Sequence, residues 1–208
     1  MIALQLLQIL KLNNNLMLKR CFDLLFSILG LIVLFPILLL ISICIILDSK
    51  GPILFIQGRV GKNNIDFNIY KFRTMRIQSQ KKGLLTLGNN DSRITKIGYF
   101  LRRYKIDEFP QLINILKGDM SFVGPRPELR YYVNFYNEDD LKIFKIRPGI
   151  TGLAQVNQSA DTCLEDVENK LYWDHAYALS LVDMSSWLKA DIKIILQTFQ
   201  TMVMSRGH

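Results

Sequence analysis

Histidine and cysteine are scarce in this sequence, and their scarcity excludes several kinds of site. The histidines are His175 and His208, so a zinc site built on histidine and cysteine is not expected. The three cysteines, Cys21, Cys44 and Cys163, form no C-x-x-C pair. Because this set is odd in number and scattered, it does not indicate a disulfide framework, and we expect the soluble part to face a reducing cytosol.

Charged residues are missing from the whole stretch Leu24–Leu47. At about 1.5 Å per residue, a straight helix of this length measures roughly 36 Å, more than the roughly 30 Å of a bilayer's hydrocarbon core. The stretch is too long for a signal peptide and lacks a small-residue cleavage site. It therefore predicts a helix inserted in a membrane.

Two topologies fit this helix. Pro36 lies near the middle of the helix and is expected to kink it. A kinked helix could be re-entrant, so that it enters and leaves the membrane by the same face. Both flanks are basic, and the positive-inside rule would then place both of them in the cytoplasm. These flanking residues are Lys11, Lys19 and Arg20 before the helix and Lys50, Arg59 and Lys62 after it. Since many spanning helices contain proline, the residues alone leave both a single span and a re-entrant helix open.

The composition otherwise suits one folded domain with an attached segment. Half of the 208 residues are apolar, and the formal charge of +8 suits nucleic acid, an acidic bilayer face or a phosphorylated substrate. We divide the chain into an N-terminal extension (1–16), a membrane helix (17–49) and a catalytic domain (50–208). The extension ends in an asparagine-rich stretch that predicts a break, so it is either a short surface helix or an upstream start, with Met17 as a second initiator.

The domain is predicted to be α+β and mainly helical. Two strand-like runs, ILFIQGRVG and FNIYKFRTM, are joined by GKNNID and indicate a β-hairpin. Residues 76–94 carry turn signals and predict a long loop. The spacing of apolar residues predicts helices over Ile94–Tyr104 and Ser185–Met204. The second helix has a broad apolar side that suits either core packing or the bilayer interface.

An acid pair, Asp107-Glu108, precedes Pro110 and the helical run QLINIL. Because proline is tolerated only in a helix's first turn, the helix is expected to begin at about Asp107 or Glu108, which favours ionised carboxylates. Such a pair is usually only a helix cap. Arg126, held between Pro125 and Pro127, adds a rigid guanidinium suited to phosphate.

Three segments resemble successive signatures of the bacterial sugar transferase family, the small monotopic polyprenyl-phosphate phosphoglycosyl transferases. They are YKFRTM, RITKIGYFLRRYKIDEFPQLINILKGDMSFVGPRPE and RPGITGLAQVN, and the likeness runs from about Lys19 to Thr198. The resemblance implies a re-entrant membrane helix broken at Pro36. It also implies a compact domain with membrane-interface helices on the cytoplasmic face of the bacterial inner membrane.

The resemblance further implies a reaction between a UDP-sugar and polyprenyl (undecaprenyl) phosphate. It makes Asp107 the nucleophile that forms a covalent phosphosugar intermediate with release of UMP, and Glu108 the residue that holds Mg²⁺. It assigns substrate phosphate to Lys71, Arg73, Arg102 and Arg126, and the nucleotide or sugar region to Arg147, Thr151 and Gln155. The product, a polyprenyl-diphospho-sugar, would start a capsule, lipopolysaccharide or exopolysaccharide.

Two departures from the family pattern bear on these expectations. Phe35-Pro36 stands where the family has Ser-Pro, so Pro36 alone must kink the helix. Gln158-Ser159-Ala160 stands where the family commonly has Gly-Arg. Besides membrane lipid and the two substrates, a homodimer stays open as a partner, and nucleic acid is not expected. The competing hypothesis is a basic membrane protein without catalysis that binds nucleotides or anionic lipid.

Overall fold

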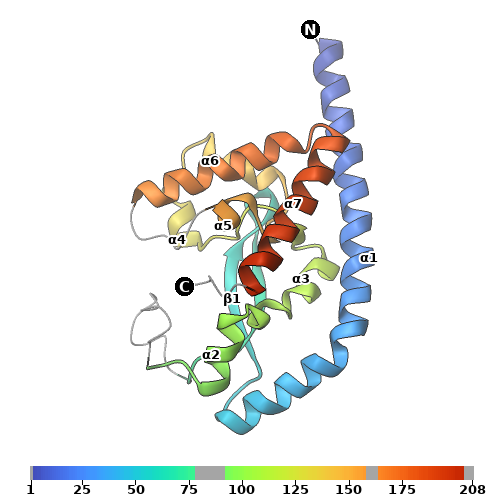
Figure 1. The fold of residues 1–208 in the computed structure, drawn as a ribbon. Helices are drawn as coiled ribbons and strands as arrows, with labels where there is room; N and C mark the ends of the chain where they lie inside the picture. Colours follow the sequence, from blue (N-terminus) through green and yellow to red (C-terminus); the bar gives the residue numbers. More distant parts are fainter. Residues whose placement is uncertain (1, 78–91, 158–163, 204–208) are drawn as a thin grey trace.

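The computed structural model describes residues 2–77, 92–157 and 164–203. Its longest element is α1, Ile2–Asp48, which runs down one side of the molecule (Figure 1). The break expected after residue 16 is wrong, because α1 continues through the three asparagines. The side-chain amide of Asn15 donates to the carbonyl oxygens of Leu181 (2.9 Å) and Val182 (3.0 Å), so tertiary packing outweighs the local tendency of asparagine to form turns.

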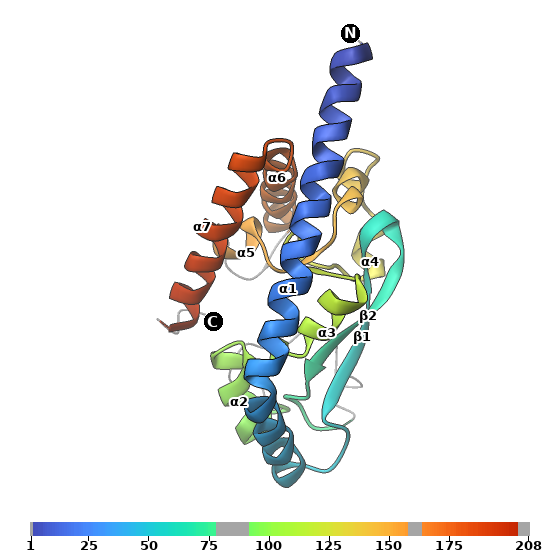
Figure 2. The same ribbon diagram turned by 90° about the vertical axis from the view of Figure 1, so that its right-hand side faces the viewer.

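Pro36 bends α1 rather than ending it. The proline lies inside the helix, which continues to Asp48, and the helix axis changes direction toward its C-terminal end (Figures 1 and 2). A proline removes one backbone hydrogen bond and crowds the preceding turn, which is enough to tilt the two halves while the remaining bonds hold the helix together. The expected break is therefore a bend.

The predicted β-hairpin is confirmed. Strands β1, Leu54–Val60, and β2, Asp66–Phe72, are antiparallel, with Leu54 opposite Phe72 and Val60 opposite Asp66. The predicted helices appear as α2, Lys96–Arg103, and α7, Met184–Val203. The other helices and strands are α3 Gln111–Lys117, β3 Ser121–Val123, α4 Arg130–Val133, β4 Gly149–Thr151, α5 Leu153–Asn157 and α6 Leu164–Ser180, with 3₁₀ turns at Lys62–Asn64, Ile106–Glu108 and Asp140–Lys145.

Strands β3 and β4 form a short parallel pair that joins two proline-containing loops. Gly124 N donates to Thr151 O (2.9 Å), and Gly149 N donates to Pro125 O (2.8 Å). A Cβ atom on Gly124 would lie 2.4 Å from the carbonyl oxygen of Arg147, and one on Gly149 would lie 2.2 Å from the nitrogen of Gly124. Only glycine permits this approach, which brings the Gly-Pro-Arg-Pro and Arg-Pro-Gly loops into contact.

A buried polar stripe joins α1 to the domain. Its members are Asn15, Lys19, Asp23 and Ser27, spaced four residues apart on one side of the helix. Lys19 pairs with Asp191 of α7. Asp23 Oδ1 accepts from the hydroxyl of Ser121 (3.1 Å) and from the backbone N–H of Phe122 (3.1 Å).

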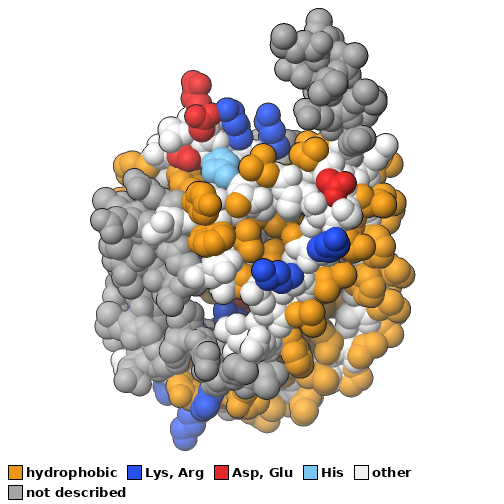
Figure 3. All heavy atoms as spheres, turned by 45° about the horizontal axis from the view of Figure 1, so that its top comes forward, with side chains coloured by type: hydrophobic (Ala, Val, Ile, Leu, Met, Phe, Trp, Pro, Cys, Tyr) orange, Lys and Arg blue, Asp and Glu red, His pale blue; other side chains and the backbone are white. Residues whose placement is uncertain are grey.

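The opposite sides of α1 are apolar and exposed. Among the described residues, α1 is the one helix long and apolar enough to cross a membrane. Side chains such as Ile32, Val33 and Leu47 are 67 to 80% exposed. Hydrophobic side chains cover much of the right-hand edge of Figure 3, the side along which α1 runs in Figure 1.

The helix α7 has two faces, and each fits one of the two roles left open for it. Trp187 and Ile194 are buried in the core, in a cluster that also contains Tyr177 and Val123. A second set of apolar side chains is exposed: Leu188, Ile192, Ile195, Leu196 and Phe199. One face of α7 therefore packs in the core and the other presents an apolar surface.

Substitution of Lys19 by methionine tests the buried ion pair. Lys19→Met leaves the Asp191 carboxylate buried without its cation, so we expect the free energy of unfolding to fall by about 3 kcal/mol. Adding Asp191→Leu should restore most of the lost free energy of unfolding, because it removes the unpaired buried carboxylate. The hydroxyl of Tyr177 keeps Val123 O as an acceptor in this double variant. Thermal unfolding in detergent measures both changes. Lys142→Met, which removes an exposed pair with Asp139, should not alter the midpoint; equal losses in both single variants would contradict this role.

Candidate active site

The acid pair lies in a 3₁₀ turn, Ile106–Glu108, ahead of α3. The expected helix start at Asp107 or Glu108 is therefore wrong, since α3 begins at Gln111 with Pro110 as its N-cap. Pro110 has no N–H to give to Ile106 O, and that oxygen instead accepts from Phe109 N (3.1 Å). The turn begins after Lys105, whose φ of 53° reverses the chain.

Glu108 is paired with one cation and lies near others. Lys71 of β2 donates to Glu108 Oε1 at 2.6 Å, and both side chains are less than a fifth exposed. Burial works against ionisation of Glu108, but the charges of Lys71 and Arg126 outweigh it and lower its pKa to about 2. Glu108 is therefore a fixed anion at the centre of a basic site.

Asp107 has the opposite electrostatic environment. Burial and the negative charge of Glu108 raise the pKa of Asp107 to about 6, against the smaller opposing effects of Lys71 and Arg102. The expectation that the surroundings of both carboxyls favour ionisation is therefore wrong for Asp107, because burial and the charge of Glu108 shift its pKa upward. A carboxyl with a pKa of about 6 is still mostly ionised at pH 7 and is more basic than an ordinary aspartate.

A small cleft beside Glu108 gathers residues from four parts of the chain. It is lined by Arg59, Ile69, Lys71, Glu108, Gln111, Arg126, Pro127, Gly149, Ile150 and Gln155. Three of these side chains carry positive charge and one carries negative charge. Such a cleft suits a phosphorylated ligand, because cations on rigid elements bind phosphate oxygens without reorganisation.

Arg126 is fixed through its neighbours. Pro125 and Pro127 are buried, whereas Arg126 between them is exposed. The carbonyl oxygen of Pro125 accepts from Gly149 N (2.8 Å), and that of Pro127 accepts from Arg59 Nη1 (3.1 Å). The backbone on both sides of Arg126 is therefore held in place by hydrogen bonds, which agrees with the rigid placement expected for this residue.

Arg59 is a cleft residue that the sequence reasoning treated only as a flanking positive charge. It lies in β1, where Gln57 Oε1 accepts from its Nη2 (2.8 Å) and Nε (3.2 Å). Burial, together with the charge of Arg126, lowers the pKa of Arg59 to about 10, so it remains a cation at neutral pH. The alternation along β1, which puts Gln57 and Arg59 on one face, is the signal that could have indicated its role.

Two of the four predicted phosphate ligands need comment. Arg102 lies near Asp107, whose pKa its charge lowers, and donates from Nε to Thr74 Oγ1 (2.8 Å). Arg73 is buried away from the cleft and donates to Lys50 O (2.6 Å) and Ser49 O (2.7 Å). Because β2 ends at Phe72, Arg73 does not continue the face of Lys71 and instead caps the C-terminal end of α1, so the structure does not bring it to the cleft.

The three residues assigned to the nucleotide or sugar region lie in different places. Arg147 donates from Nε to Gly118 O (2.8 Å) and lies beside Lys19 and Lys62, apart from the residues that line the cleft. Thr151 is buried, with its hydroxyl 2.6 Å from that of Thr198. Gln155 lines the cleft, and its Oε1 is buried without a hydrogen-bond partner among the described residues. Only Gln155 of the three is placed to meet a ligand in the cleft.

The donor set fits a magnesium ion held largely by substrate. The described residues contain no group of three His, Cys, Asp or Glu side chains suited to hold a metal. Glu108 accepts from Lys71 through Oε1 and is one of the residues that line the cleft. One carboxylate oxygen, completed by phosphate and water, is a usual environment for Mg²⁺. The residues Gln158-Ser159-Ala160, and most of the predicted loop 76–94, lie outside the described residues.

Comparison with known proteins identifies relatives along nearly the whole chain. A UDP-N-acetylgalactosamine-undecaprenyl-phosphate N-acetylgalactosaminephosphotransferase of Aeromonas hydrophila is 38% identical over 192 residues, which cover 91% of this chain and 44% of the relative. An undecaprenyl-phosphate glucose phosphotransferase of Komagataeibacter xylinus is 40% identical over 198 residues, covering 91% and 36%. The uncharacterised sugar transferase EpsL of Bacillus subtilis (strain 168) is 36% identical over 192 residues, covering 91% and 89%.

The first two relatives are longer proteins, and the chain spans less than half of each. The model of the family described as "Bacterial sugar transferase" matches residues 14–205, which include the membrane-type helix, the acid pair and both proline-containing loops. On this match and these identities, the chain belongs to the bacterial sugar transferase family.

Proposed function

We propose that this protein transfers a sugar-1-phosphate from a UDP-sugar to polyprenyl phosphate at the inner membrane, as the first membrane step of surface glycan synthesis. The observation that carries the proposal is the pair of unequal carboxyls. Glu108 is paired with Lys71, whereas the Asp107 side chain has no ion-pair partner among the residues that the structure describes and its pKa is raised. The names of the relatives, which pair a UDP-sugar or a sugar with undecaprenyl phosphate, agree with this chemistry.

In the first step, a carboxylate oxygen of Asp107 attacks the β-phosphorus of the UDP-sugar. A P–O bond forms to Asp107, the bond from that phosphorus to the bridging oxygen breaks, and UMP leaves. In the second step, a phosphate oxygen of polyprenyl phosphate attacks the same phosphorus and the carboxylate of Asp107 leaves. The raised pKa makes Asp107 a better nucleophile than an ordinary aspartate, while most of it is ionised at neutral pH.

The remaining groups of the cleft stabilise charge on the transferred phosphoryl group. Lys71 and Arg126, on a strand and on a proline-bounded loop, offer fixed cations to its oxygens. Bound Mg²⁺ would neutralise part of the diphosphate charge, and the carboxylate of Glu108 would hold it. Arg59 keeps Pro127 in place and so orients Arg126.

The same structure supports a re-entrant rather than a spanning α1. The domain contacts both parts of the helix, through Lys19 and Asp191 near one end and through Asp48 and Ile97 near the other, where Asp48 Oδ2 accepts from Ile97 N (3.1 Å). A straight spanning helix would draw this polar domain into the hydrocarbon core. With a bend at Pro36, both ends of α1 and the domain can stay on the cytoplasmic side.

The covalent step predicts different defects for the two carboxyls. Asp107→Asn should give no phosphosugar adduct and lower turnover roughly a thousandfold or more, because the amide is not a nucleophile. Glu108→Gln should lower UMP release by about a hundredfold or more through loss of charge at the metal position. UMP release and intact-protein mass spectrometry with a panel of UDP-sugars measure both. Parental turnover in Asp107→Asn would contradict the mechanism.

Arg126 and Arg130 form a matched pair for testing phosphate binding. Arg126→Ala should lower UMP release by about a hundredfold, and Arg126→Lys should recover only part, because lysine lacks the bidentate fork. Arg130→Ala removes an exposed pair with Asp66 outside the cleft and should leave the rate close to parental. Equal losses in the two alanine variants would argue against a specific role of Arg126.

Cysteine labelling tests the topology. In a background without native cysteines, Leu18→Cys and Lys50→Cys would introduce thiols at exposed positions at either end of the apolar stretch. Both should react with an impermeant maleimide only after the cytoplasmic side is opened, because the bent helix returns to its side of entry. Labelling of the two thiols from opposite sides would mean that α1 spans the membrane.

A further inference from the structure

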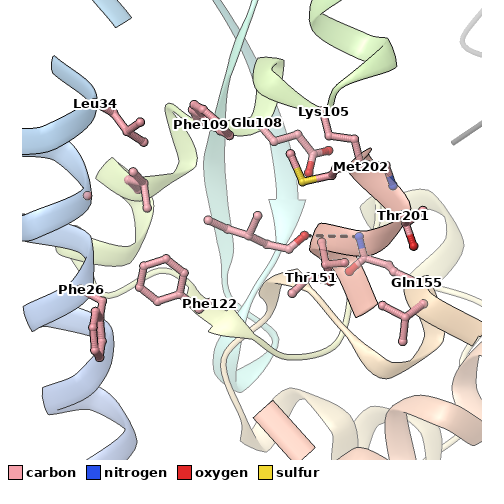
Figure 4. Close-up of a pocket in the computed structure, with 15 residues that line it drawn as sticks. Phe26, Leu34, Lys105, Glu108, Phe109, Phe122, Thr151, Gln155, Thr201 and Met202 are labelled. Atoms are coloured by element: carbon pink, nitrogen blue, oxygen red, sulfur yellow. Dashed lines mark hydrogen bonds between the residues drawn. The ribbon is translucent and has the colours of Figure 1, made fainter. Parts of the chain in front are cut away.

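A second cavity lies next to the acid pair, between α1 and the C-terminal part of α7. Its volume is about 250 Å³, and Figure 4 shows side chains of both helices converging on it together with Glu108. The helix α1 contributes Phe26, Gly30 and Leu34, and the central part of the domain contributes Phe109 and Phe122.

The three threonines that line this cavity have hydrogen-bond partners in the protein. The hydroxyl of Thr198 donates to Ile194 O (2.8 Å), and that of Thr201 donates to Gln197 O (2.8 Å), both within α7. The hydroxyl of Thr151 lies 2.6 Å from that of Thr198. The wall is mainly hydrocarbon, and its charged groups, Lys105 and Glu108, belong to the turn of the acid pair.

This apolar cavity and the charged cleft share part of their walls. Glu108, Ile150 and Gln155 line both. A dashed line in Figure 4 marks the bond from Gln155 Nε2 to Ile150 O (3.3 Å) at this shared wall. On its other side the cavity is bounded by α1, whose outer surface is apolar and exposed. A ligand with a phosphate in the cleft and a hydrocarbon tail in the cavity would match both environments.

We propose that this cavity, bounded by Gly30 of α1 and Thr201 of α7, binds the isoprenoid segment next to the phosphate of the lipid acceptor. The inference rests on the proposed function and adds the site of one substrate. A volume of about 250 Å³ admits only the part of a long polyprenyl chain nearest the phosphate. A sugar or a nucleotide base would find its hydroxyl and amide groups facing hydrocarbon, which is unfavourable.

Gly30→Leu is the variant that fills the cavity. A Cβ atom on Gly30 would lie 3.4 Å from Leu112 Cδ1, an ordinary van der Waals separation, so the backbone need not move. Leucine also has a higher helix propensity than glycine, which protects the fold. Val33→Phe adds bulk to the exposed face of the same helix and is the control.

The experiment separates the two half-reactions. Intact-protein mass spectrometry without lipid follows formation of the phosphosugar adduct, and addition of undecaprenyl phosphate to the preformed adduct follows its loss. Gly30→Leu should form the adduct at the parental rate and raise the lipid concentration needed for half-maximal transfer by about tenfold, the loss expected when roughly two methylene groups are no longer buried. Val33→Phe should match the parent in both steps.

Thr201→Phe narrows the cavity from the opposite wall and should reproduce the selective defect. Parental lipid dependence in both cavity variants would overturn the proposal. A slower first half-reaction in both, with an unchanged second, would also overturn it, because the cavity would then serve the UDP-sugar. A parental protein that forms no adduct at all would instead contradict the proposed function.

Discussion

The packing of a strongly apolar helix on the domain through buried polar groups is the constraint on which the rest of this structure depends. An apolar stripe alone would not fix α1, because its other faces are equally apolar and could pack in many rotations. The ion pair of Lys19 with Asp191 and the hydrogen bonds from Ser121 and Phe122 to Asp23 select one rotation. That rotation turns Phe26, Gly30 and Leu34 toward the acid pair, so a structural ion pair determines which side of the helix forms a wall of the active site.

The site itself depends on a difference in ionisation between two adjacent carboxyls. Two carboxyls in equivalent surroundings would share the nearby cations equally. Here Lys71 donates to Glu108, and burial together with the negative charge of Glu108 raises the pKa of Asp107. The cations lower the pKa of one carboxyl to about 2, while burial keeps the other near 6. One residue is therefore an anion throughout the neutral range and its neighbour is a more basic carboxyl, which suits the metal and nucleophile roles proposed for them.

Local patterns in the sequence predicted the hairpin, α2, α7 and the residues of the acid pair, because alternation, helical spacing and turn residues act over short range. They failed where tertiary contacts decide. Asn15 is held in a helix by carbonyls more than 160 residues away, and Arg73 lies beyond the end of its strand and caps α1. The position of Pro110 predicts a helix that contains both acids in its first turn. Because proline has no N–H to donate, the acids instead lie in a 3₁₀ turn, and α3 begins after the proline. Alternation along β1 places Arg59 on one face of the strand, but only the folded structure shows its hydrogen bond to Pro127 in the loop of Arg126.

The small size of the charged cleft favours a two-step reaction on physical grounds. A UDP-sugar and a lipid phosphate are both anions, and in the proposed reaction both would use the cations of Lys71 and Arg126. Simultaneous binding would place two phosphate groups against the same few charges, at a large cost in repulsion. If Asp107 first accepts the phosphosugar and UMP leaves, the same cations can serve the lipid phosphate afterwards. The apolar cavity shares Glu108 and Gln155 with the cleft, so the second substrate could enter from the side of α1 without crossing the path of the nucleotide. The proposed covalent intermediate would thus let one basic cleft act in turn on a water-soluble donor and a membrane-bound acceptor.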